Sequence, residues 1–341
     1  MPVYKMYRNP YHIDDLSKHS FLVTGGAGFI GSNLVEYLIK YGARKVRVLD
    51  NLSTGYIHNI QSYISNPSFE FIEGDIRDLE TCSSACAGMD FVLHQAALGS
   101  VPRSIIDPIT TNEVNISGFL NMLVAVKDRG IKRMVYAASS STYGDSTALP
   151  KLENKIGNPL SPYAVTKYVN ELYANVFAQT YQLELIGLRY FNVFGPRQDP
   201  KGAYAAVIPK FVIQLINHES PVINGDGTHS RDFTFIENVV QANMLAVFTD
   251  NTDAINTVYN VAFGEQTSLN QLIQILKKNL SVSDPHINEV NAIYGPVREG
   301  DIPHSLASIE KAKKKLEYSP RFNFAKGLEL TVEWFIENKK N

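Results

Sequence analysis

The chain of 341 residues is long enough for two domains, or for one domain with a large additional lobe. Hydrophobic residues make up 44% of it and charged residues 19%, a composition typical of a globular protein with a substantial core. The formal net charge of −2 argues against non-specific binding of nucleic acid. No apolar run approaches the roughly 18 residues of a membrane span, and the N-terminus lacks a secretory h-region, so we expect a cytoplasmic protein.

Two features of the sequence carry no functional signal. Residues 1–19 are polar and aromatic, and we expect a partly helical N-terminal extension that packs on the main body. Cys82 and Cys86 fit neither a disulfide framework nor the spacing of a zinc site. We interpret them as small, half-buried thiols on a helix, and no metal site is predicted.

The first nucleotide-binding signal is a strand, a glycine-rich turn and a helix. Residues 21–24 form a short apolar run typical of a buried parallel strand, and an amphipathic pattern extends to about residue 41. Gly25, Gly28 and Gly31 lie between them with GxxGxxG spacing. Gly25 permits the tight turn, Gly28 lets a pyrophosphate approach the backbone, and Gly31 lets the helix pack on the strand. The N-terminus of the helix then faces the phosphates.

The second predicted strand, residues 45–50, ends in a carboxylate. Asp50 stands about 20 residues beyond the glycine turn, where an acid accepts hydrogen bonds from both hydroxyls of the adenosine ribose. Such an acid repels a 2′-phosphate, and Asn51 rather than an arginine follows it. The sequence therefore predicts NAD and not NADP as the cofactor. The alternative is a surface acid at the end of a strand.

The third and fourth predicted strands, residues 69–72 and 91–94, end near the same cofactor. Asp75 is placed to reach the adenine amino group, with Ile76 under the ring. After the fourth strand, the small residues of segment 95–97 let the backbone lie against the cofactor. His94 ends that strand, and we interpret it as a packed core histidine rather than a catalyst.

The later elements continue the alternation of strands and helices. A long helical pattern covers residues 103–129, and strands are predicted at 134–138 and 185–189. The serines of segment 139–141 follow the fifth strand directly, at the sheet edge where ligands bind, which argues against a merely solvated turn. The alternation predicts an α/β protein with a doubly wound parallel sheet, the Rossmann arrangement.

A helix that begins near Pro162 carries the candidate catalytic pair. Tyr163 and Lys167 lie four residues apart, so their side chains share one face of the helix. An ammonium beside a phenol favours the phenolate, so we expect the tyrosine pKa to fall from about 10 toward neutrality. Tyr163 is thus a candidate general acid or base. The alternative is an ordinary amphipathic helix with an exposed lysine.

Beyond residue 190 the rhythm changes to turns and short elements, and we expect a smaller α/β substrate-binding lobe. Two arginines in this near-neutral region, Arg231 and Arg298, are candidates for pairing with a diphosphate, the alternative being solvated surface residues. We expect residues 20–190, with about 236–265, to form the NAD-binding domain. Residues 191–235 and 266–341 then form the lobe.

From about residue 20 to the C-terminus, the chain resembles the extended short-chain dehydrogenase/reductases, and within them the nucleotide-sugar 4-epimerases. The resemblance is closest to bacterial UDP-N-acetylglucosamine 4-epimerases of O-antigen and polysaccharide synthesis. The motifs that carry it are GGAGFIGSN (25–33), LDN (49–51), GDIRD (74–78), HQAA (94–97), LGSVPRSIIDP (98–108), SSSTYGD (139–145), YAVTK (163–167), RYFNVFGPR (189–197) and REGD (298–301).

The resemblance implies a reaction. The Tyr163 phenolate takes the proton of the sugar 4-hydroxyl while the C4 hydride passes to NAD⁺. The 4-keto sugar turns over, and the hydride returns to its opposite face. Lys167 lowers the tyrosine pKa and holds the nicotinamide ribose. A serine hydroxyl bridges the 4-oxygen, and counting back four residues from Tyr143 selects Ser139, with Ser140 the open alternative.

The resemblance also implies the binding residues. Those for NAD are Gly25, Gly28, Phe29, Ile30, Gly31, Asp50, Asn51, Ser53, Thr54, Gly55, Asp75, Ile76, Gln95, Ala96, Ala97, Asn115, Tyr163, Lys167, Tyr190 and Val193. Those for the UDP-sugar are Gly99, Ser100, Arg103, Ser139, Ser140, Ser141, Tyr163, Asn192, Ala206, Val207, Asn224, Arg231, Arg298, Asp301 and Ser305.

Two positions bear on the reaction and the substrate. Family dehydratases carry Asp-Glu where this chain has Ser140 and Ser141, so epimerisation is expected. Epimerases restricted to UDP-glucose and UDP-galactose carry a tyrosine where this chain has Ser305, which leaves space for an N-acetyl group. The Gly99-Ser100 turn offers further room. The alternative role of Ser305 is the N-cap of a helix expected over 306–317.

We therefore predict a UDP-N-acetylglucosamine/UDP-N-acetylgalactosamine 4-epimerase with tightly bound NAD. A UDP-glucose/UDP-galactose or a UDP-N-acetylhexosaminuronate 4-epimerase, a net oxidoreductase and a non-catalytic NAD/UDP-sugar-binding module are the alternatives. The resemblance implies a homodimer through the helices near 103–129 and 162–180. No nucleic-acid or membrane partner is expected.

Overall fold

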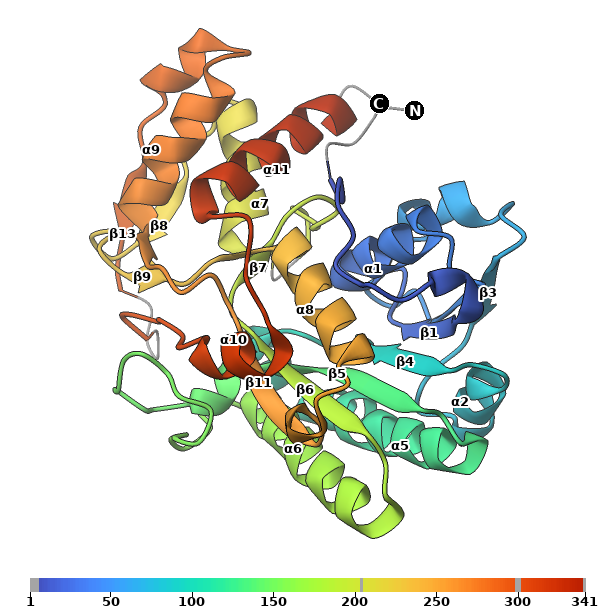
Figure 1. The fold of residues 1–341 in the computed structure, drawn as a ribbon. Coiled ribbons are helices and arrows are strands. Elements are labelled where there is room, and N and C mark those ends of the chain that lie inside the picture. Colours follow the sequence, from blue (N-terminus) through green and yellow to red (C-terminus); the bar gives the residue numbers. More distant parts are fainter. Residues whose placement is uncertain (1–5, 203–204, 298–301, 340–341) are drawn as a thin grey trace.

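The computed structural model describes residues 6–202, 205–297 and 302–339. Its centre is a seven-stranded parallel sheet in the order β11-β6-β5-β4-β1-β2-β3 (Figure 1). The strands are β1 (Ser20–Thr24), β2 (Lys45–Asp50), β3 (Phe69–Glu73), β4 (Phe91–His94), β5 (Arg133–Ser139), β6 (Leu185–Tyr190) and β11 (Thr257–Val261). The six predicted strands are all present, and β11 is an edge strand that the sequence analysis does not predict.

Helices cover both faces of the sheet, as the doubly wound arrangement requires. Helices α1 (Phe29–Lys40) and α8 (Ile236–Phe248) lie on one face, and α2 (Leu79–Cys86), α5 (Gly118–Arg129) and α6 (Pro162–Tyr181) on the other (Figure 1). Because side chains alternate along a strand, Phe21 and Val23 of β1 enter one core while Leu22 enters the other. The continuous apolar run of β1 is thus explained by burial on two faces.

The strand order places a ligand crevice beside β1. The chain runs from β1 outward through β2 and β3, then returns to place β4 on the other side of β1. At such a reversal the loops that follow the two central strands part, which leaves a crevice at their carboxyl ends. The glycine turn after β1 and segment 95–97 after β4 border this crevice.

Two helical predictions are wrong in their boundaries. The pattern over 103–129 divides into α3 (Val101–Ile106), α4 (Pro108–Asn112), a π-helical turn (Glu113–Ser117) and α5. The break has a local cause, because Pro108 takes the first position of α4 and Asp107 caps it by accepting from the backbone of Thr110. The helix expected over 306–317 is α10 (Glu310–Leu316).

The two cysteines are more deeply buried than expected. Cys82 and Cys86 on α2 are both fully buried, rather than half-buried. Burial raises the pKa of each thiol to about 12, so both stay protonated at neutral pH. Among the described residues, no cluster of histidine, cysteine or acidic side chains could hold a metal ion. No described helix is both long and apolar enough to span a membrane.

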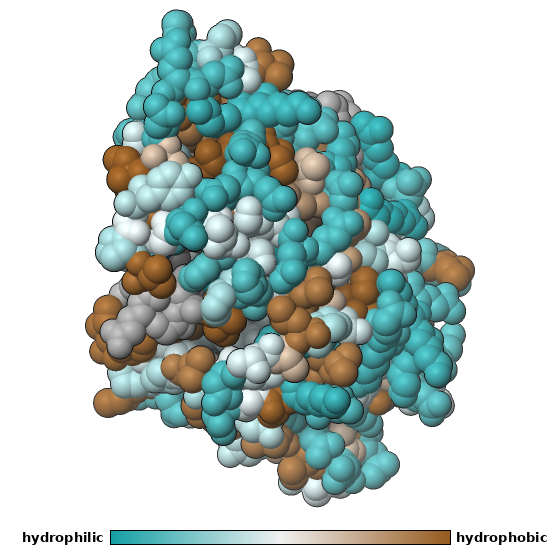
Figure 2. Space-filling model, turned by 90° about the vertical axis from the view of Figure 1, so that its left-hand side faces the viewer, coloured by the Kyte–Doolittle hydropathy of each residue, from teal (hydrophilic) through white to brown (hydrophobic). Residues whose placement is uncertain are grey.

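The remaining elements form a smaller α/β lobe (Figure 1). It comprises α7 (Val207–Ile216), α9 (Leu269–Leu280), α11 (Phe324–Lys339) and the pairs β8 (Val222–Asn224) with β13 (Ile293–Gly295), β9 (Ser230–Arg231) with β12 (Thr267–Ser268), and β7 (Val193–Phe194) with β10 (Thr234–Phe235). On the face that carries β8 and β13, apolar residues lie scattered among polar ones (Figure 2). Short 3₁₀ helices occur at Leu16–Lys18, Ile57–Asn59, Gln61–Tyr63, Ser140–Tyr143, Thr252–Ala254 and Pro285–Glu289.

The N-terminal extension packs on the main body, as predicted. The Tyr7 hydroxyl donates to Asn33 Oδ1 of α1 over 2.9 Å. The Tyr7 backbone N–H and the Tyr11 hydroxyl both donate to Glu237 Oε1 of α8, over 3.0 and 2.6 Å. Tyr7, Tyr11 and Glu237 are buried, so the extension joins the two helices of one face.

Candidate active site

A cavity of about 310 Å³ lies in the crevice between β1 and β4. Segments after β1, β2, β3 and β4 form its walls, and the residues implied for NAD converge there from all four. Of those residues, Gly25, Gly28, Phe29, Ile30, Gly31, Asp50, Asn51, Ser53, Thr54, Gly55, Asp75, Ile76, Gln95, Ala96 and Ala97 line it. Gly99, implied for the substrate, lines it as well.

The glycine turn is shaped by close approaches that exclude side chains. Gly25 has φ +67°, and a Cβ there would lie 2.7 Å from the backbone nitrogen of Ala96. A Cβ at Gly31 would lie 2.1 Å from the Gly25 carbonyl oxygen. The backbone is thus pressed against β4 and α1, and the N-terminus of α1 is left open toward the cavity, with no side-chain cap at Gly28. This geometry fits a pyrophosphate.

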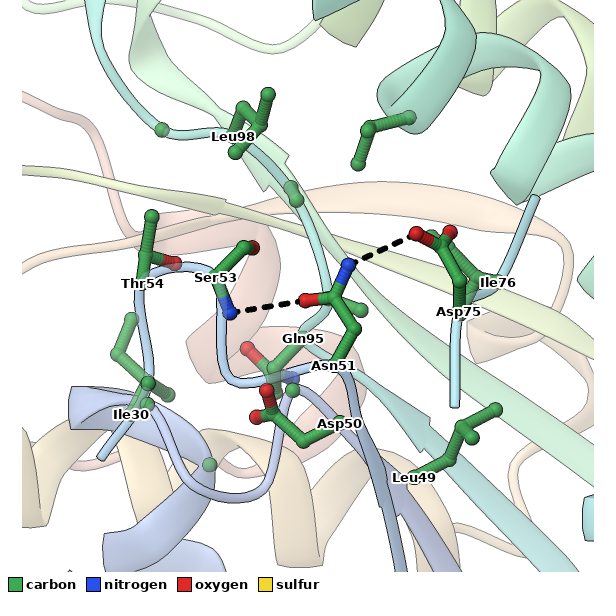
Figure 3. Close-up of a pocket in the computed structure, with 18 of the residues that line it drawn as sticks. Ile30, Leu49, Asp50, Asn51, Ser53, Thr54, Asp75, Ile76, Gln95 and Leu98 are labelled. Atoms are coloured by element: carbon green, nitrogen blue, oxygen red, sulfur yellow. Dashed lines mark hydrogen bonds between the residues drawn. The ribbon is translucent and has the colours of Figure 1, made fainter. Parts of the chain in front are cut away.

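The acidic wall of the cavity is held by hydrogen bonds. Asp50 Oδ2 accepts from the Ala27 N–H and Oδ1 from the Leu52 N–H, each over 2.9 Å. Burial raises the Asp50 pKa, and these two N–H groups oppose that rise. Across the cavity mouth, Asn51 Nδ2 donates to Asp75 Oδ2 over 2.8 Å (Figure 3). These carboxylate acceptors fit an adenosine, with Asp50 for the ribose hydroxyls and Asp75 near the amino group of the base.

Five residues implied for NAD lie outside the lining of this cavity, and two of them, Tyr163 and Lys167, form the candidate catalytic pair described below. The Asn115 amide is engaged by the protein, since its Oδ1 accepts from the Leu98 N–H and its Nδ2 donates to the Leu98 carbonyl and to Thr166 Oγ1. The Tyr190 hydroxyl lies 3.2 Å from Gln95 Oε1, so it borders a lining residue. Val193 is half-buried in β7.

The candidate catalytic residues meet where β5 ends and α6 begins. Pro162 occupies the first turn of α6, and Ser161 caps it by accepting from the Ala164 N–H. The Ser139 side chain at the end of β5 lies near the Tyr163 phenol and lowers its pKa. Of the two serines left open by the sequence, Ser139 is therefore the one in contact with Tyr163.

The hydrogen bonds of Ser139 extend to the third serine of the run. The Ser139 and Ser141 hydroxyl oxygens lie 2.8 Å apart, and the Ser141 N–H donates to Ser139 Oγ over 3.1 Å. Ser140 lies between them and is the first residue of the 3₁₀ turn Ser140–Tyr143.

The expected fall in the Tyr163 pKa is wrong for this structure. Burial raises the phenol pKa, and the hydrogen bond from Ser139 lowers it by less. Lys167 is buried, and its Nζ donates to the Ala137 carbonyl over 2.9 Å. Burial lowers the Lys167 pKa to about 8, which the charge of Glu171 opposes. Desolvation therefore controls the Tyr163 pKa. The sequence prediction considered only the charge of a lysine four residues away.

A second cavity, of about 290 Å³, lies in the smaller lobe. Of the residues implied for the UDP-sugar, Asn192, Val207, Asn224 and Arg231 line it, and Ala206 is the N-cap of α7 beside it. The described lining also includes Lys210 and His229 but no carboxylate. Together with the N-terminus of α7, which has no side-chain cap, these groups favour an anion.

Several residues that line this second cavity were not predicted from the sequence. They are Ala205, Lys210, Phe211, Val222, Ile223, His229, Phe233 and Leu269. Lys210 lies on the first turn of α7, three residues after Val207. The helical pattern of that segment could have predicted that it faces the same side as Val207. The aromatic and aliphatic members come from separate elements, which no local pattern brings together.

The helix-cap role considered for Ser305 is wrong. Helix α10 starts at Glu310 with Ile309 as its N-cap. The Ser305 hydroxyl oxygen instead accepts from the Asp232 N–H over 3.3 Å and from Asn192 Nδ2 over 3.5 Å. Ser100 caps α3 by accepting from the Arg103 N–H. Arg298 and Asp301 lie outside the described residues.

The family is established by comparison with known proteins. Residues 21–262 match the model of the NAD dependent epimerase/dehydratase family, and the chain belongs to that family. This membership confirms the predicted resemblance, the Rossmann fold, an NAD-dependent epimerase as the enzyme class and NAD as the cofactor.

Three relatives indicate the range of substrates in the family. A UDP-N-acetylglucosamine 4-epimerase from Methanobrevibacter ruminantium, solved with UDP-N-acetylmuramic acid, is 40% identical, with a TM-score of 0.87 over 94% of this chain and 99% of that one. A UDP-glucose 4-epimerase from Thermotoga maritima, solved with UDP-glucose, is 36% identical, with a TM-score of 0.85 over the same shares. A UDP-glucuronate 4-epimerase from Thermodesulfobacterium geofontis is 33% identical over 93% of this chain and 96% of its own.

The Asp50 carboxylate predicts which dinucleotide the protein carries. We expect nucleotide released from the purified protein by denaturation to be NAD(H), because a buried acid at the ribose repels a 2′-phosphate. Mass spectrometry of the released nucleotide measures this directly. An Asp50→Asn variant removes the charge. It is expected to reduce the preference for NAD⁺ over NADP⁺ when the two compete for binding. Release of NADP(H) from the unaltered protein would contradict the assignment.

Proposed function

We propose that the protein interconverts UDP-N-acetylglucosamine and UDP-N-acetylgalactosamine by epimerisation at C4. The observation that carries the reaction is the placement of the Ser139 hydroxyl beside the buried Tyr163 phenol, whose pKa it lowers, with Lys167 on the same face of α6. Ser140 and Ser141 stand where dehydratases of the family carry carboxylates. Without an acid and base for C6, a 4-keto sugar is reduced again rather than dehydrated.

In the proposed reaction Tyr163 moves the proton of the sugar 4-hydroxyl, and Ser139 holds the 4-oxygen. NAD⁺, when bound in the cavity between β1 and β4, would supply the hydride acceptor for C4 and the donor for its return. Tyr163 must give up its own proton first, which the high pKa of the buried phenol opposes. The proposed role of Lys167 is to favour that ionisation with the charge of its ammonium group. Burial lowers the Lys167 pKa to about 8.

The proposed site of the uridine diphosphate is the cavity of the smaller lobe. Its cationic lining from Lys210 and Arg231 suits two phosphates, and Val207 is the first residue of α7. In this arrangement residues 191–235 and 266–341 bind the nucleotide part of the substrate. Residues 20–190, with about 236–265, bind NAD.

The proposed N-acetyl preference rests on Ser305. Its hydroxyl oxygen accepts from the Asp232 N–H and Asn192 Nδ2, which leaves its O–H able to donate. A small donor of this kind suits the carbonyl oxygen of an N-acetyl group. The Asn192 side chain lines the lobe cavity, so this contact lies at the cavity wall.

A Ser305→Tyr variant is expected to lose activity on the N-acetylated pair and to keep or gain activity on UDP-galactose. The larger side chain fills the space proposed for the acetyl group, and such overpacking typically costs about 1–3 kcal/mol. The measurement is kcat/KM for both substrate pairs. Ser305→Ala is the matched control, because it removes the hydroxyl without filling the space. An unchanged N-acetyl preference in Ser305→Tyr would place the pocket wall elsewhere.

The most direct test of the function is to mix the purified protein with UDP-N-acetylglucosamine and to look for the galacto epimer. Conversion without added NAD⁺ supports an epimerase that retains its cofactor. Stoichiometric consumption of added NAD⁺ would instead indicate a net oxidoreductase. No conversion of any UDP-hexose or uronate, together with binding of NAD and UDP, would indicate a non-catalytic module.

We also propose a homodimer through α3, α4 and α6. Ile105, Ile106 and Ile109 on the first two helices are 62–74% exposed, and Leu172 and Val176 on α6 are 49% and 54% exposed. Helices α3 and α4 both contact α6, so these side chains share one region of the surface. Apolar surface of this kind favours burial against a second copy. Light scattering on the purified protein measures the molar mass.

A further inference from the structure

A buried carboxylate that none of the proposed chemistry uses lies behind the lobe cavity. Asp232 stands between β9 and β10, and its side chain is fully buried. Its Oδ1 accepts from the Phe263 and Gly264 N–H groups, each over 3.3 Å. Its Oδ2 accepts from Gly264 over 3.2 Å and from Ala307 over 3.1 Å. One side chain thus ties the turn after β11 to the segment before α10.

The main chain of the same residue holds the two polar side chains of the proposed sugar pocket. The Asp232 N–H donates to Ser305 Oγ, and the Asp232 carbonyl accepts from Asn192 Nδ2 over 3.0 Å. The Ser305 N–H donates to the Ser230 carbonyl over 3.1 Å, which aligns segment 304–307 with β9. The carboxylate fixes this segment at Ala307, two residues beyond Ser305. Arg231, next to Asp232 in sequence, lines the cavity.

We propose that Asp232 is a positioning residue, which sets the place of the Ser305 and Asn192 side chains in the sugar pocket by holding Ala307 and Gly264. This inference rests on the proposed function, and it adds a residue that does not itself touch the substrate. A displacement of about 1 Å in such a wall is enough to cost on the order of 100-fold in rate. Burial raises the Asp232 pKa to about 7, and the N–H groups that surround the carboxylate oppose that rise.

The test uses Asp232→Asn, which keeps the shape of the side chain. An amide has one acceptor oxygen, so its NH₂ group must face either the Ala307 N–H or the Gly264 and Phe263 N–H groups, and one attachment is lost. We expect kcat/KM for the UDP-hexose to fall about 10-fold or more, through positioning of the sugar. Bound NAD and the Kd for UDP alone, measured by calorimetry, are expected to stay within about twofold. The matched control is Asp226→Asn. Asp226 lies in an exposed turn and accepts from the Thr228 N–H, a contact that the asparagine oxygen can also make.

A double-mutant cycle with Ser305→Ala separates positioning from general support of the fold. If Asp232 acts through Ser305, the double variant is little worse than Asp232→Asn alone. The proposal would be overturned if the losses in kcat/KM of the two single variants multiplied in the double variant. A fall in UDP affinity that matches the fall in kcat/KM would overturn it as well. The cycle is run on whichever UDP-hexose the unaltered protein converts, so an error in the proposed substrate is seen first and separately.

A second variant covers failure of Asp232→Asn to fold. Ala307→Pro removes the N–H that donates to Asp232 Oδ2 and leaves the carboxylate in place. It is expected to lower kcat/KM while the Kd for UDP stays within about twofold. If neither variant folds, the carboxylate is a requirement of folding rather than of positioning, and the proposal fails.

Discussion

Replacing Tyr163 with phenylalanine is expected to lower kcat by about 10²- to 10⁴-fold, the usual contribution of a general acid–base group. The phenyl ring keeps the packing at the start of α6 and removes the ionisable oxygen that lies near Ser139. Folding and bound NAD are therefore expected to be unchanged. The measurement is kcat at saturating UDP-hexose, with circular dichroism and released dinucleotide as checks.

Tyr168→Phe is the matched control for this prediction. Tyr168 lies on the same helix, five residues further on, and the proposed reaction does not use it. Its variant should retain ordinary turnover. A Tyr163→Phe protein that kept more than a tenth of the unaltered kcat would remove Tyr163 from the role of proton carrier.

Replacing Arg189 with methionine is expected to lower the free energy of unfolding by about 3–5 kcal/mol, because it strands a buried charge. Arg189 Nε and Nη2 donate to the two Glu171 oxygens over 2.8 and 2.7 Å, and the side chains are 3% and 8% exposed. A third donor, Nη1, reaches the Glu153 carbonyl over 3.0 Å. Urea denaturation measures the loss.

The double variant Arg189→Met with Glu171→Gln is the control for stranded charge. Removing the second charge should return part of the lost stability, since the cost arises chiefly from an unpaired carboxylate. Loss of less than about 1 kcal/mol in Arg189→Met would show that water reaches Glu171 and that the pair behaves like a surface salt bridge.

The parts of the fold that could be predicted from the sequence are those with local causes. Strands β1, β2 and β5 are largely apolar because they are buried on both faces, and a glycine, an aspartate and a serine mark their ends. The turn at Gly25 follows from the conformation and the close approach that glycine alone permits. These features give the order of the elements and the cavity between β1 and β4.

The helix break near residue 107 is marked in the sequence, but the helical spacing of the apolar residues led to the prediction of one helix. Asp107-Pro108 is a cap followed by a first-turn proline, which starts a new helix. The apolar residues on either side keep helical spacing, so the pattern suggests one long helix. Strand β11 is missed for a different reason, because its pairing with β6 is a contact between distant parts of the chain.

The electrostatics of the site could not be predicted from spacing. The Tyr163–Lys167 interval fixes a shared helix face, but the pKa depends on what surrounds each group. Lys167 donates to the Ala137 carbonyl of β5, and burial controls the phenol. Ser305 is a similar case, since its partners Asn192 and Asp232 are distant in sequence.

The contacts of the N-terminal extension matter for anyone who shortens or fuses this protein. The segment shared with the family begins at residue 21, so a boundary drawn from homology would remove Tyr7 and Tyr11. Glu237 is 2% exposed with the extension in place, and both donors to its Oε1 would be lost with the extension, at a cost of about 1–3 kcal/mol. The stable unit of this protein therefore starts upstream of the homologous region, and a cleavage site or tag junction belongs before Tyr7.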